Sequence, residues 1–355
     1  MGKVVISGSD IADIGFGIVG GMYMGRYSVG IILVCLLVSA AFGDRPGKAK
    51  GATEVEFFVY VIDVDDIDGA NQNFAVNVFL FLEWNDKRLA SEGGIVRRFP
   101  LKEVWNPRIL IVNQQGLIRP SMPEVVEVAS DGTVTYRQRY VGRMSQPLKL
   151  SEFPFDEHDF TIHFVSTGHR PDELRFVPGA ARDNMGLVGG GMQERLSLPD
   201  WEILSYQAVK RAYEPVAGTE VSGFVFEFRA KRYAAYYIWQ VIAPLVFIVM
   251  MSWGGFWIDP TNAGAQIGVA TSSILTLIAY RFMLGNLLPR LPYMTRMDYF
   301  TLGSTALVFL TLVEVIITTK LVRSEMAALG RKIDIWCRVV FPLAFVAWSV
   351  LSLLH

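Results

Sequence analysis

Long apolar segments are concentrated in the last third of this chain, where the hydrophobic pattern predicts helices. An α-helix needs about 20 residues to cross the hydrocarbon core of a bilayer. Four segments reach that length, over residues 237–258, 263–284, 299–319 and 335–354. The pattern therefore predicts an all-α transmembrane domain of four helices within residues 233–355.

Residues 44–232 show a different pattern, in which apolar and polar side chains alternate. Phe160, Ile162 and Phe164 alternate with polar residues, as in a strand that buries one face. The same alternation, interrupted by turn residues, recurs over 74–82, 109–113, 125–129, 133–141, 201–208 and 224–228. Many short strands without a long helical pattern predict an all-β, immunoglobulin-like sandwich.

A glycine-rich stretch, Gly186–Gly191, interrupts the predicted strands. It has neither the lysine nor the strand-to-helix context of a phosphate-binding loop. We therefore expect it to be a flexible connection.

The second apolar segment carries an ordered stripe of residues along one helical face. Steps of four and three residues align side chains on an α-helix. Starting at Gly264, these steps reach Gly268, Ser272, Leu275, Ala279 and Phe282. The beginning of the stripe is small or polar, and its end is apolar and mostly larger.

Several polar residues in this segment are out of place on a helix that faces lipid. Gln266, Thr271, Ser272, Ser273 and Thr276 carry amide or hydroxyl groups, which are costly to bury without partners. Two interpretations remain open. The helix lines a water-filled pore, or it lies in a bundle where its hydroxyls bond to its own carbonyls.

The first 43 residues are expected to be a signal peptide. Val29–Val38 is a short apolar run that follows Arg26 and precedes small residues, an arrangement typical of secretory signals. A fifth membrane helix is the alternative, although the run is short for a span. Removal of this segment would leave residues 44–232 as an exported domain.

Charge near the third and fourth predicted helices supports the same orientation. The expected linker, residues 320–334, carries Lys320, Arg323, Arg331 and Lys332 against Glu325 and Asp334. Short basic loops tend to stay in the cytoplasm. An even number of helices returns the C-terminus to the side of the exported N-terminal domain, which leaves this linker on the cytoplasmic side.

Composition removes several classes of function. The net charge of −1 argues against nucleic acid as a partner, since phosphate binding needs clustered basic residues. The two cysteines, Cys35 and Cys337, lie outside the predicted sandwich, which therefore has no disulfide. His158 and His163 leave open a weak metal site with Asp159, but a solvated strand face is favoured. We expect no enzyme, cofactor or metal.

Five local motifs occur in an order that is more specific than any one of them. They are Trp84–Leu89, Val104–Pro107, Phe153–Asp156, Trp239–Pro244 and Leu288–Thr295. Over roughly residues 54–355 the chain resembles the pentameric ligand-gated ion channels of the Cys-loop receptor superfamily. It resembles their bacterial branch in particular, because it lacks the cysteines around the signature loop Phe153–Asp156 and has a short linker between the third and fourth helices.

The resemblance implies a homopentamer whose second membrane helices surround a central pore. It makes Gly264 a pore-lining residue, Gly268 and Ser272 the hydrated part of the path, and Leu275, Ala279 and Phe282 the closed gate. The alternative is that Leu275 and Phe282 pack against neighbouring helices. Hydrophobic constrictions can gate by dewetting. Cation-conducting relatives place glutamate, and anion-conducting ones Pro-Ala-Arg, where this chain has Gly264-Ala265-Gln266, so charge selectivity stays open.

The resemblance also implies a coupling region between sandwich and pore. Asp156 and Arg232 are expected to form ion pairs there with an acid of the cluster Asp65, Asp66 and Asp68, for which we take Asp68. Pro289 and Tyr293 would lie beside them. For isolated surface charges the alternative is an exposed pair of little energetic value.

The agonist site is expected between subunits, under the hairpin at residues 211–222. Its implied residues are Trp105, Arg119, Arg139, His169 and Tyr213. Arginines suit carboxylates through bidentate bonds, whereas aromatic cages suit amines. Because arginine outnumbers the aromatic residues here, an anionic small molecule or a proton is favoured as agonist. Trp105 as a core residue and the arginines as solvated strand residues are the alternatives.

Together these features predict a ligand-gated channel for passive conduction of inorganic ions, held in membrane lipid. The alternative is a non-conducting, membrane-anchored periplasmic sensor. The stripe from Gly264 to Phe282 distinguishes the two, because an anchor gains nothing from it.

Overall fold

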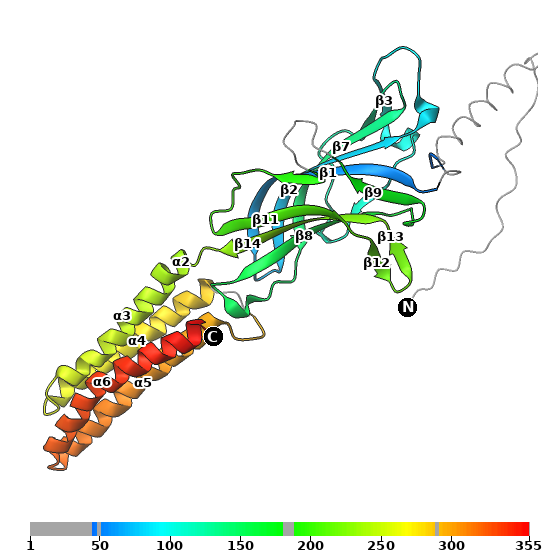
Figure 1. Ribbon diagram of the computed structural model, residues 1–355. Helices are drawn as coiled ribbons and strands as arrows, with labels where there is room; N and C mark the ends of the chain where they lie inside the picture. The colour runs from blue at the N-terminus through cyan, green and yellow to red at the C-terminus, as the bar shows by residue number, and fades with distance from the viewer. Residues whose placement is uncertain (1–44, 48–50, 180–187, 288–290, 355) are drawn as a thin grey trace, which may run out of the picture. The chain divides into compact units, whose positions relative to one another are not determined.

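The computed structural model describes residues 45–47, 51–179, 188–287 and 291–354. The signal peptide expected over residues 1–43 lies outside these ranges. Residues 45–355 form one compact unit, which contains a β-sandwich followed by four long helices (Figure 1).

The larger sheet of the sandwich is built around a pair of long antiparallel strands. Its members are β1 (Thr53–Asp68), β2 (Asn73–Asn85), β3 (Arg97–Pro100), β5 (Gln114–Gln115), β6 (Val125–Val128), β7 (Thr133–Ser145), β9 (Leu174–Pro178) and β10 (Gly190–Met192). The strand order is β10-β1-β2-β7-β6-β3, with β5 paired to β7 and β9 to β1.

The smaller sheet faces it and has the order β11-β14-β8-β4. Its strands are β4 (Ile109–Ile111), β8 (Glu157–Ser166), β11 (Trp201–Lys210) and β14 (Gly223–Arg232), and a separate hairpin joins β12 (Tyr213–Val216) to β13 (Thr219–Val221). Three short 3-10 turns, η2 (Lys87–Leu89), η3 (Leu101–Glu103) and η4 (Leu150–Glu152), lie in the connections.

Aromatic side chains from both sheets form the core between them. Alternation turns Phe160 and Phe228 inward, where their rings stack at 5.0 Å, and Phe74 of β2 meets Phe228 edge-on at 5.6 Å. Phe57 and Phe224 stack across the sheets at 4.2 Å. Such pairs add about 0.5–1.5 kcal/mol each beyond their buried area. The expected sandwich is confirmed.

The glycine-rich stretch is not only a flexible connection, and that expectation is wrong for its end. Gly190–Met192 is the strand β10, which pairs in parallel with β1. A Cβ atom at Gly190 would lie 2.8 Å from the Val59 carbonyl oxygen, so glycine permits the close approach of the two strands. Gly186 and Leu187 lie outside the described ranges.

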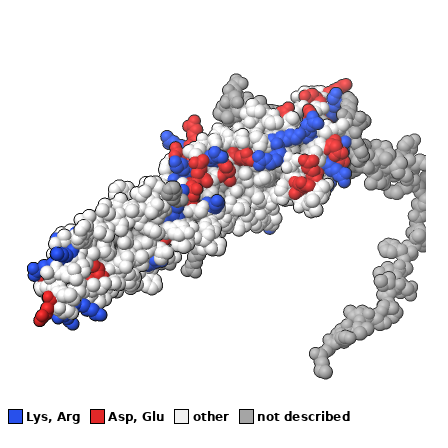
Figure 2. Space-filling model, turned by 60° about the horizontal axis from the view of Figure 1, so that its bottom comes forward, with Lys and Arg blue, Asp and Glu red and all other residues white. Residues whose placement is uncertain are grey.

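Within the residues that the structure describes, four helices are long and apolar enough to cross a membrane. The first runs from Ala235 to Trp257 through α2 (Ala235–Tyr237), the π-turn η5 (Ile238–Ile242), α3 (Ala243–Trp253) and the 3-10 turn η6 (Gly254–Trp257). The others are α4 (Ala263–Leu287), α5 (Arg296–Arg323) and α6 (Ala327–Leu354). In the view of Figure 2 the surface of the helices is largely uncharged. Charged side chains gather at the end of the helical bundle that is far from the strands, and over the strands themselves.

The linker between the last two helices is much shorter than the sequence predicted. Only Ser324–Met326 separate α5 from α6, and Glu325 turns the chain with a φ of 62°. Lys320 and Arg323 lie in the last turn of α5, where positive charge is favourable beside the helix dipole. The basic residues used for the orientation argument therefore belong to helix ends rather than to a loop.

Candidate functional site

Helix α4 has two opposite faces. The buried face comprises Gln266, Ala270, Ser273, Leu277, Tyr280 and Leu284. The stripe predicted from the sequence, Gly264, Gly268, Ser272, Leu275, Ala279 and Phe282, lies on the other side and is exposed. Leu275 is 70% and Phe282 76% exposed. The chain's own bundle thus packs one face of α4 and leaves the stripe uncovered.

Three hydroxyl groups of α4 bond to carbonyls of their own helix, as in the interpretation without a water-filled pore. Thr271, Ser273 and Thr276 donate to the carbonyls four residues before them, at 2.7, 2.9 and 2.9 Å. These three groups are satisfied within the helix, so they do not require water. The uncovered stripe, with its two large exposed apolar side chains, is a separate feature that back-bonding does not explain.

A buried ion pair lies where the smaller sheet leads into the first helix. Arg232, at the end of β14, donates Nε and Nη2 to the two carboxylate oxygens of Asp156 at 2.9 and 3.1 Å. Its guanidinium lies 4.1 Å from the ring centre of Trp201 and 5.1 Å from that of Phe153. Both charged groups are buried, so neither can rely on water for solvation.

His158 completes this arrangement, and the expectation of a solvated strand face is wrong for it. Its Nε2 lies 2.8 Å from the second oxygen of Asp156, and its side chain is nearly buried. Burial raises the pKa of Asp156, but the hydrogen bonds from His158 and Arg232 outweigh burial and hold that pKa below the ordinary 3.8. Asp156 is therefore a stable carboxylate at neutral pH.

The lowered pKa of Asp156 predicts a pH dependence of stability. Above pH 3.8 the carboxyl is charged in both the unfolded and the folded protein, and the ion pair contributes fully. As the pH falls below that value, the unfolded chain takes up the proton first and this contribution is lost. We expect the difference in melting temperature between the wild type and Asp156→Asn to be constant near neutral pH and to shrink below about pH 4. A difference that stays the same well below that pH would contradict the assignment.

The segment before α5 contacts the loop that contains Asp156. The Leu150 amide donates to the Tyr293 hydroxyl at 2.9 Å, and that hydroxyl donates to the Leu148 carbonyl at 3.5 Å. The Met297 amide donates to the Phe153 carbonyl at 3.3 Å. A capping box of Thr295 and Asp298 fixes the start of α5, so these contacts join a rigid helix end to the sandwich.

Asp68 lies beside this region, because a Cβ at the next residue, Gly69, would lie 2.9 Å from the Leu150 side chain, but among the described residues its carboxylate takes no part in the ion pair of Asp156 and Arg232. Asp68 accepts hydrogen bonds from the amide and the side chain of Asn71 at 2.9 and 2.7 Å, which hold the turn after β1. Asp66 pairs instead with Arg143 of β7 at 2.8 Å. Pro289, the other expected neighbour, lies outside the described residues.

Of the five expected ligand residues, two come together within this chain. Trp105 is buried, with its ring centre 5.7 Å from that of Trp84 and 5.3 Å from that of His169. Burial lowers the pKa of His169. The Trp105 indole nitrogen and the His169 Nε2 are buried without a hydrogen-bond partner among the described residues. Trp105 is thus a core residue of the single chain.

The remaining three ligand candidates lie apart from that pair. Arg139, on β7, donates to the Asn77 side chain at 2.9 Å. Arg119 is exposed in the loop before β6. Tyr213 lies on the β12–β13 hairpin, with its ring 6.4 Å from that of His163. Within one chain these residues do not form a common pocket with Trp105.

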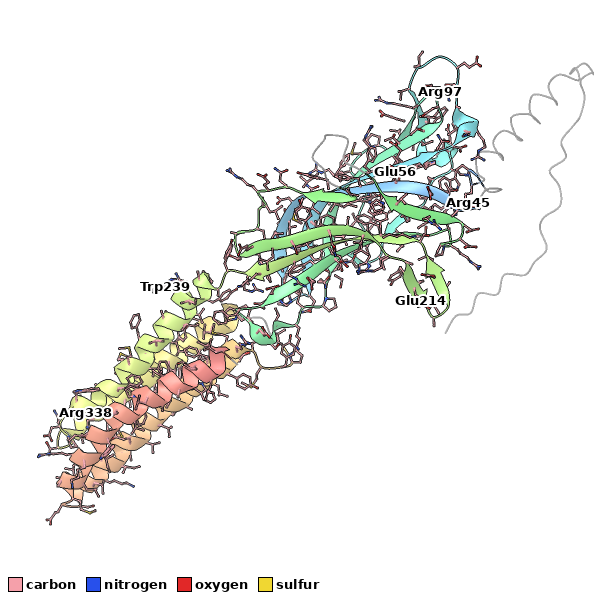
Figure 3. All side chains as sticks on the ribbon, viewed as in Figure 1. Arg45, Glu56, Arg97, Glu214, Trp239 and Arg338 are labelled. Carbon is pink, nitrogen blue, oxygen red and sulfur yellow. The ribbon has the colours of Figure 1, made fainter. Side chains whose placement is uncertain are left out.

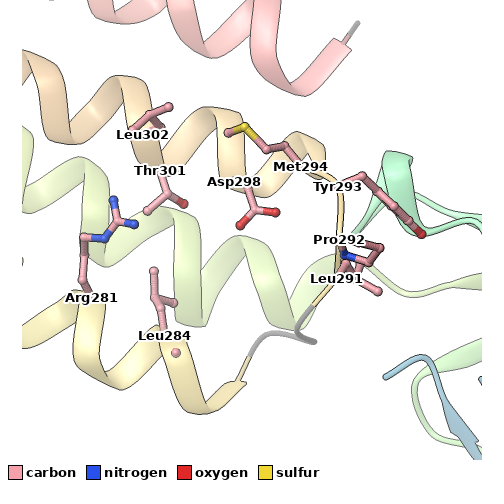
Figure 4. Close-up of a pocket in the computed structure, with 10 residues that line it drawn as sticks. Arg281, Leu284, Leu291, Pro292, Tyr293, Met294, Asp298, Thr301 and Leu302 are labelled. Atoms are coloured by element: carbon pink, nitrogen blue, oxygen red, sulfur yellow. The ribbon is translucent and has the colours of Figure 1, made fainter. Parts of the chain in front are cut away.

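Sequence reasoning missed a pocket of about 610 Å³ beside the segment between α4 and α5. Figure 4 shows its lining, with Arg281 and Leu284 from α4 and Asp298 and Thr301 from α5. Arg281 donates to the Thr305 hydroxyl at 3.2 Å. A charged residue inside an apolar segment was the available signal, because such residues are costly in a membrane. Within the described ranges, no group of three or more His, Cys, Asp or Glu side chains can hold a metal ion.

Comparison with known families matches both parts of the chain. Residues 36–233 match the neurotransmitter-gated ion-channel ligand binding domain, and residues 241–327 match the neurotransmitter-gated ion-channel transmembrane region. The first match alone covers more than half of the chain. The two matches meet near the ion pair of Asp156 and Arg232.

Similar curated proteins are channels and receptor subunits. A proton-gated ion channel of Gloeobacter violaceus is 27% identical over 311 residues, which is 86% of this chain and 84% of that protein. Gamma-aminobutyric acid receptor subunits beta-4 of Gallus gallus and alpha-2 of Homo sapiens are 25% and 24% identical over 76% of this chain. The chain spans 56% and 60% of the length of those two subunits.

Proposed function

This chain belongs to the neurotransmitter-gated ion-channel family, and on that premise we propose that it forms an agonist-opened pore lined by α4. The members to which it is similar are ligand-gated ion channels, not enzymes. The observation that carries the proposal is the uncovered stripe of α4. Its side chains face away from the bundle although two of them are large and apolar.

In a homopentamer the stripe would form a series of rings around the axis. Gly268 and Ser272 would make the wide, hydrated part of the path, with Gly264 at its cytoplasmic mouth. Rings of Leu275, Ala279 and Phe282 would form an apolar constriction, which excludes water and ions when narrow. Gln266 faces the bundle, so it does not contribute to the lining.

The pore is proposed to lie in the bacterial inner membrane, surrounded by lipid, with the sandwich in the periplasm. The agonist is a small molecule or a proton bound between subunits, where His169 and Tyr213 of one subunit would meet Arg119 and Arg139 of its neighbour, with Trp105 packed behind His169 in the core. The Gloeobacter violaceus relative is proton-gated, and this supports a proton as one candidate.

Movement of the sandwich would reach α4 through the segment that follows it. Tyr293 bonds to the backbone on both sides of Lys149, and Phe153 bonds to the first turn of α5. Asp156 and Arg232 fix the loop that carries these contacts. Coupling requires an element that both sites bias, and this loop has contacts to both the strands and the helices.

Removing the Tyr293 hydroxyl should weaken this coupling. Tyr293→Phe keeps the ring but loses both hydrogen bonds to the loop, each worth about 0.5–1.5 kcal/mol. We expect about a threefold to tenfold increase in the agonist concentration for half-maximal current, with little change in expression. Tyr236→Phe, at an exposed ring on the first helix, is the control and should match the wild type. Equal shifts in both variants would exclude a specific role for Tyr293.

Recording from purified protein in planar bilayers tests the proposed function. Currents are measured under a salt gradient while pH, amines and carboxylates are varied, so that the reversal potential gives the charge selectivity. Agonist-dependent unitary currents are expected. Binding of an agonist without any conductance would favour the non-conducting sensor instead.

A further inference from the structure

Three buried side chains from three helices leave oxygen atoms without hydrogen-bond donors. They are Gln266 of α4, Glu314 of α5 and Asp334 of α6, which are 0%, 7% and 1% exposed. Gln266 Oε1, both carboxylate oxygens of Glu314 and both of Asp334 have no hydrogen-bond partner among the residues that the structure describes. Buried polar atoms nearly always have a hydrogen-bond partner. These oxygens therefore indicate that a donor or a cation binds among them.

The orientation of the Gln266 amide is fixed by its neighbours. Its Nε2 donates to the carbonyls of Gly255 and Ile258 at 3.2 and 3.0 Å. A flipped amide would bring its oxygen against two carbonyl oxygens, so the flip is excluded. Oε1 therefore faces away from these carbonyls and can be satisfied only by a donor or a cation.

The three side chains converge beside η6. Gln266 of α4 bonds to the carbonyl of Gly255 in η6, and Arg338, one turn after Asp334 on α6, donates to the carbonyl of Phe256 in the same turn. The carboxylate oxygens and Gln266 Oε1 are all acceptors, so none of them can satisfy another unless a hydrogen or a cation is supplied. Gly255, the partner of Gln266, has only a hydrogen as its side chain, and a Cβ there would lie 3.7 Å from Val315 of α5.

The charges around the cluster do not balance. When both are ionised, Glu314 and Asp334 carry two negative charges, and Arg338 on α6 (Figure 3) is a positive group that acts on Asp334. The Arg338 Nε is already donated to the Phe256 carbonyl at 3.0 Å. Asp259, the other acid that acts on Asp334, is 3.6 Å from Arg331. Cys337, on α6 close to Asp334, is a further titratable group that interacts with the two acids. One negative charge remains, and burying it unpaired is costly.

We propose that Gln266, Glu314 and Asp334 bind one positively charged species, either a sodium ion or a proton, inside each subunit. Five acceptor oxygens from two carboxyls and an amide are the ligand type that hard cations prefer. A single positive charge closes the charge balance. The occupant would tie the cytoplasmic end of α4 to α5 and α6, on the face opposite the exposed stripe.

The experiment measures the melting temperature of the purified full-length protein in detergent by tryptophan fluorescence. In the first arm sodium chloride replaces choline chloride at constant ionic strength and pH. In the second arm the pH is lowered in choline chloride alone. We expect at least one arm to raise the melting temperature by about 3 °C or more, because an occupant that binds only the folded state stabilises it.

Variants decide whether the cluster causes this dependence. Asp334→Asn, and the double variant Glu314→Gln with Asp334→Asn, supply amide hydrogens in place of the missing donor and should lose the responsive arm. Glu325→Gln, at an exposed acid near the same end of the bundle, should keep it. The single variant provides the answer if the double variant fails to fold.

A sodium response that the variants lose identifies a metal cation, and an acid response that they lose identifies a proton. No response of the wild type in either arm, or the same response in the variants, would overturn the proposal. Because the readout is stability rather than current, the result is independent of whether the protein conducts.

Discussion

Replacing Leu275 by serine is expected to open the channel without agonist. Leu275 is the leucine of the exposed α4 stripe, and a pentamer would bring one copy from each subunit to the constriction. Burying one leucine side chain away from water is favourable by roughly 1.5–3 kcal/mol, and each Leu275→Ser substitution removes most of that free energy from the closed constriction. A ring of serines would hydrate the constriction and favour the open state.

The measurement is the current of Leu275→Ser at zero and increasing agonist concentration. We expect basal current, or at least about a tenfold decrease in the half-maximal agonist concentration, since about 1.4 kcal/mol already gives that factor. Leu343→Ser is the matched control, because Leu343 is 65% exposed but lies on α6, which is not proposed to line the pore. Currents in Leu275→Ser that equal those of the wild type and the control would refute the gate.

Replacing Asp156 by asparagine is expected to destabilise the junction between the sandwich and the helices. The substituted side chain would keep its shape but leave the Arg232 guanidinium buried without a counter-charge. Breaking one partner out of a buried pair costs about 3–5 kcal/mol. The rings of Trp201 and Phe153 beside Arg232 offset only part of that cost, since a cation–π contact contributes about 0.5–2 kcal/mol.

Strands β8 and β14 also carry an exposed aspartate–arginine ion pair, which is the control for the buried one. Asp159 of β8 accepts two hydrogen bonds from Arg229 of β14, at 2.7 and 3.0 Å, and both residues are exposed. Asp159→Asn should cost no more than about 1 kcal/mol. Urea unfolding of the purified protein compares the two variants. Similar losses of stability in both would show that burial of Asp156 has no special effect.

Much of the architecture could be predicted because one pattern dominated each region. Strands such as β8 and β14 bury one face of the smaller sheet against the core, so alternation revealed them. The stripe of α4 was found from spacing alone, because the small and polar residues recur at helical intervals. Both patterns depend only on which side of an element is buried.

Elements that pair or pack on more than one side were not predicted from the sequence. β1 pairs with β2 along its length and also with β9 and β10, and its sequence is apolar on both sides at Phe57 and Phe58. The role of Gly190 depends on the position of the Val59 carbonyl, which no local pattern reveals. The third helix was also predicted too short, because α5 continues through the basic residues that had indicated a loop.

Some charged sites could be predicted from the sequence and others could not. Asp156, Arg232 and Asp68 were all named from the family resemblance, but the hydrogen-bond partner of Asp68 is Asn71, a local and uncharged residue that the resemblance does not indicate. Gln266, Glu314 and Asp334 lie in three separate helices. Their convergence depends on how those helices pack, so the only signal in the sequence was the presence of acids within apolar segments.

The central claim is that the exposed stripe of α4 lines a common axis in a pentamer. Cryo-electron microscopy of the purified protein in lipid nanodiscs tests it most directly. The account predicts a five-fold assembly in which Gly268, Ser272 and Leu275 of every subunit face a central opening. A reconstruction with these residues turned toward lipid, or packed against another helix with no opening between subunits, would contradict it.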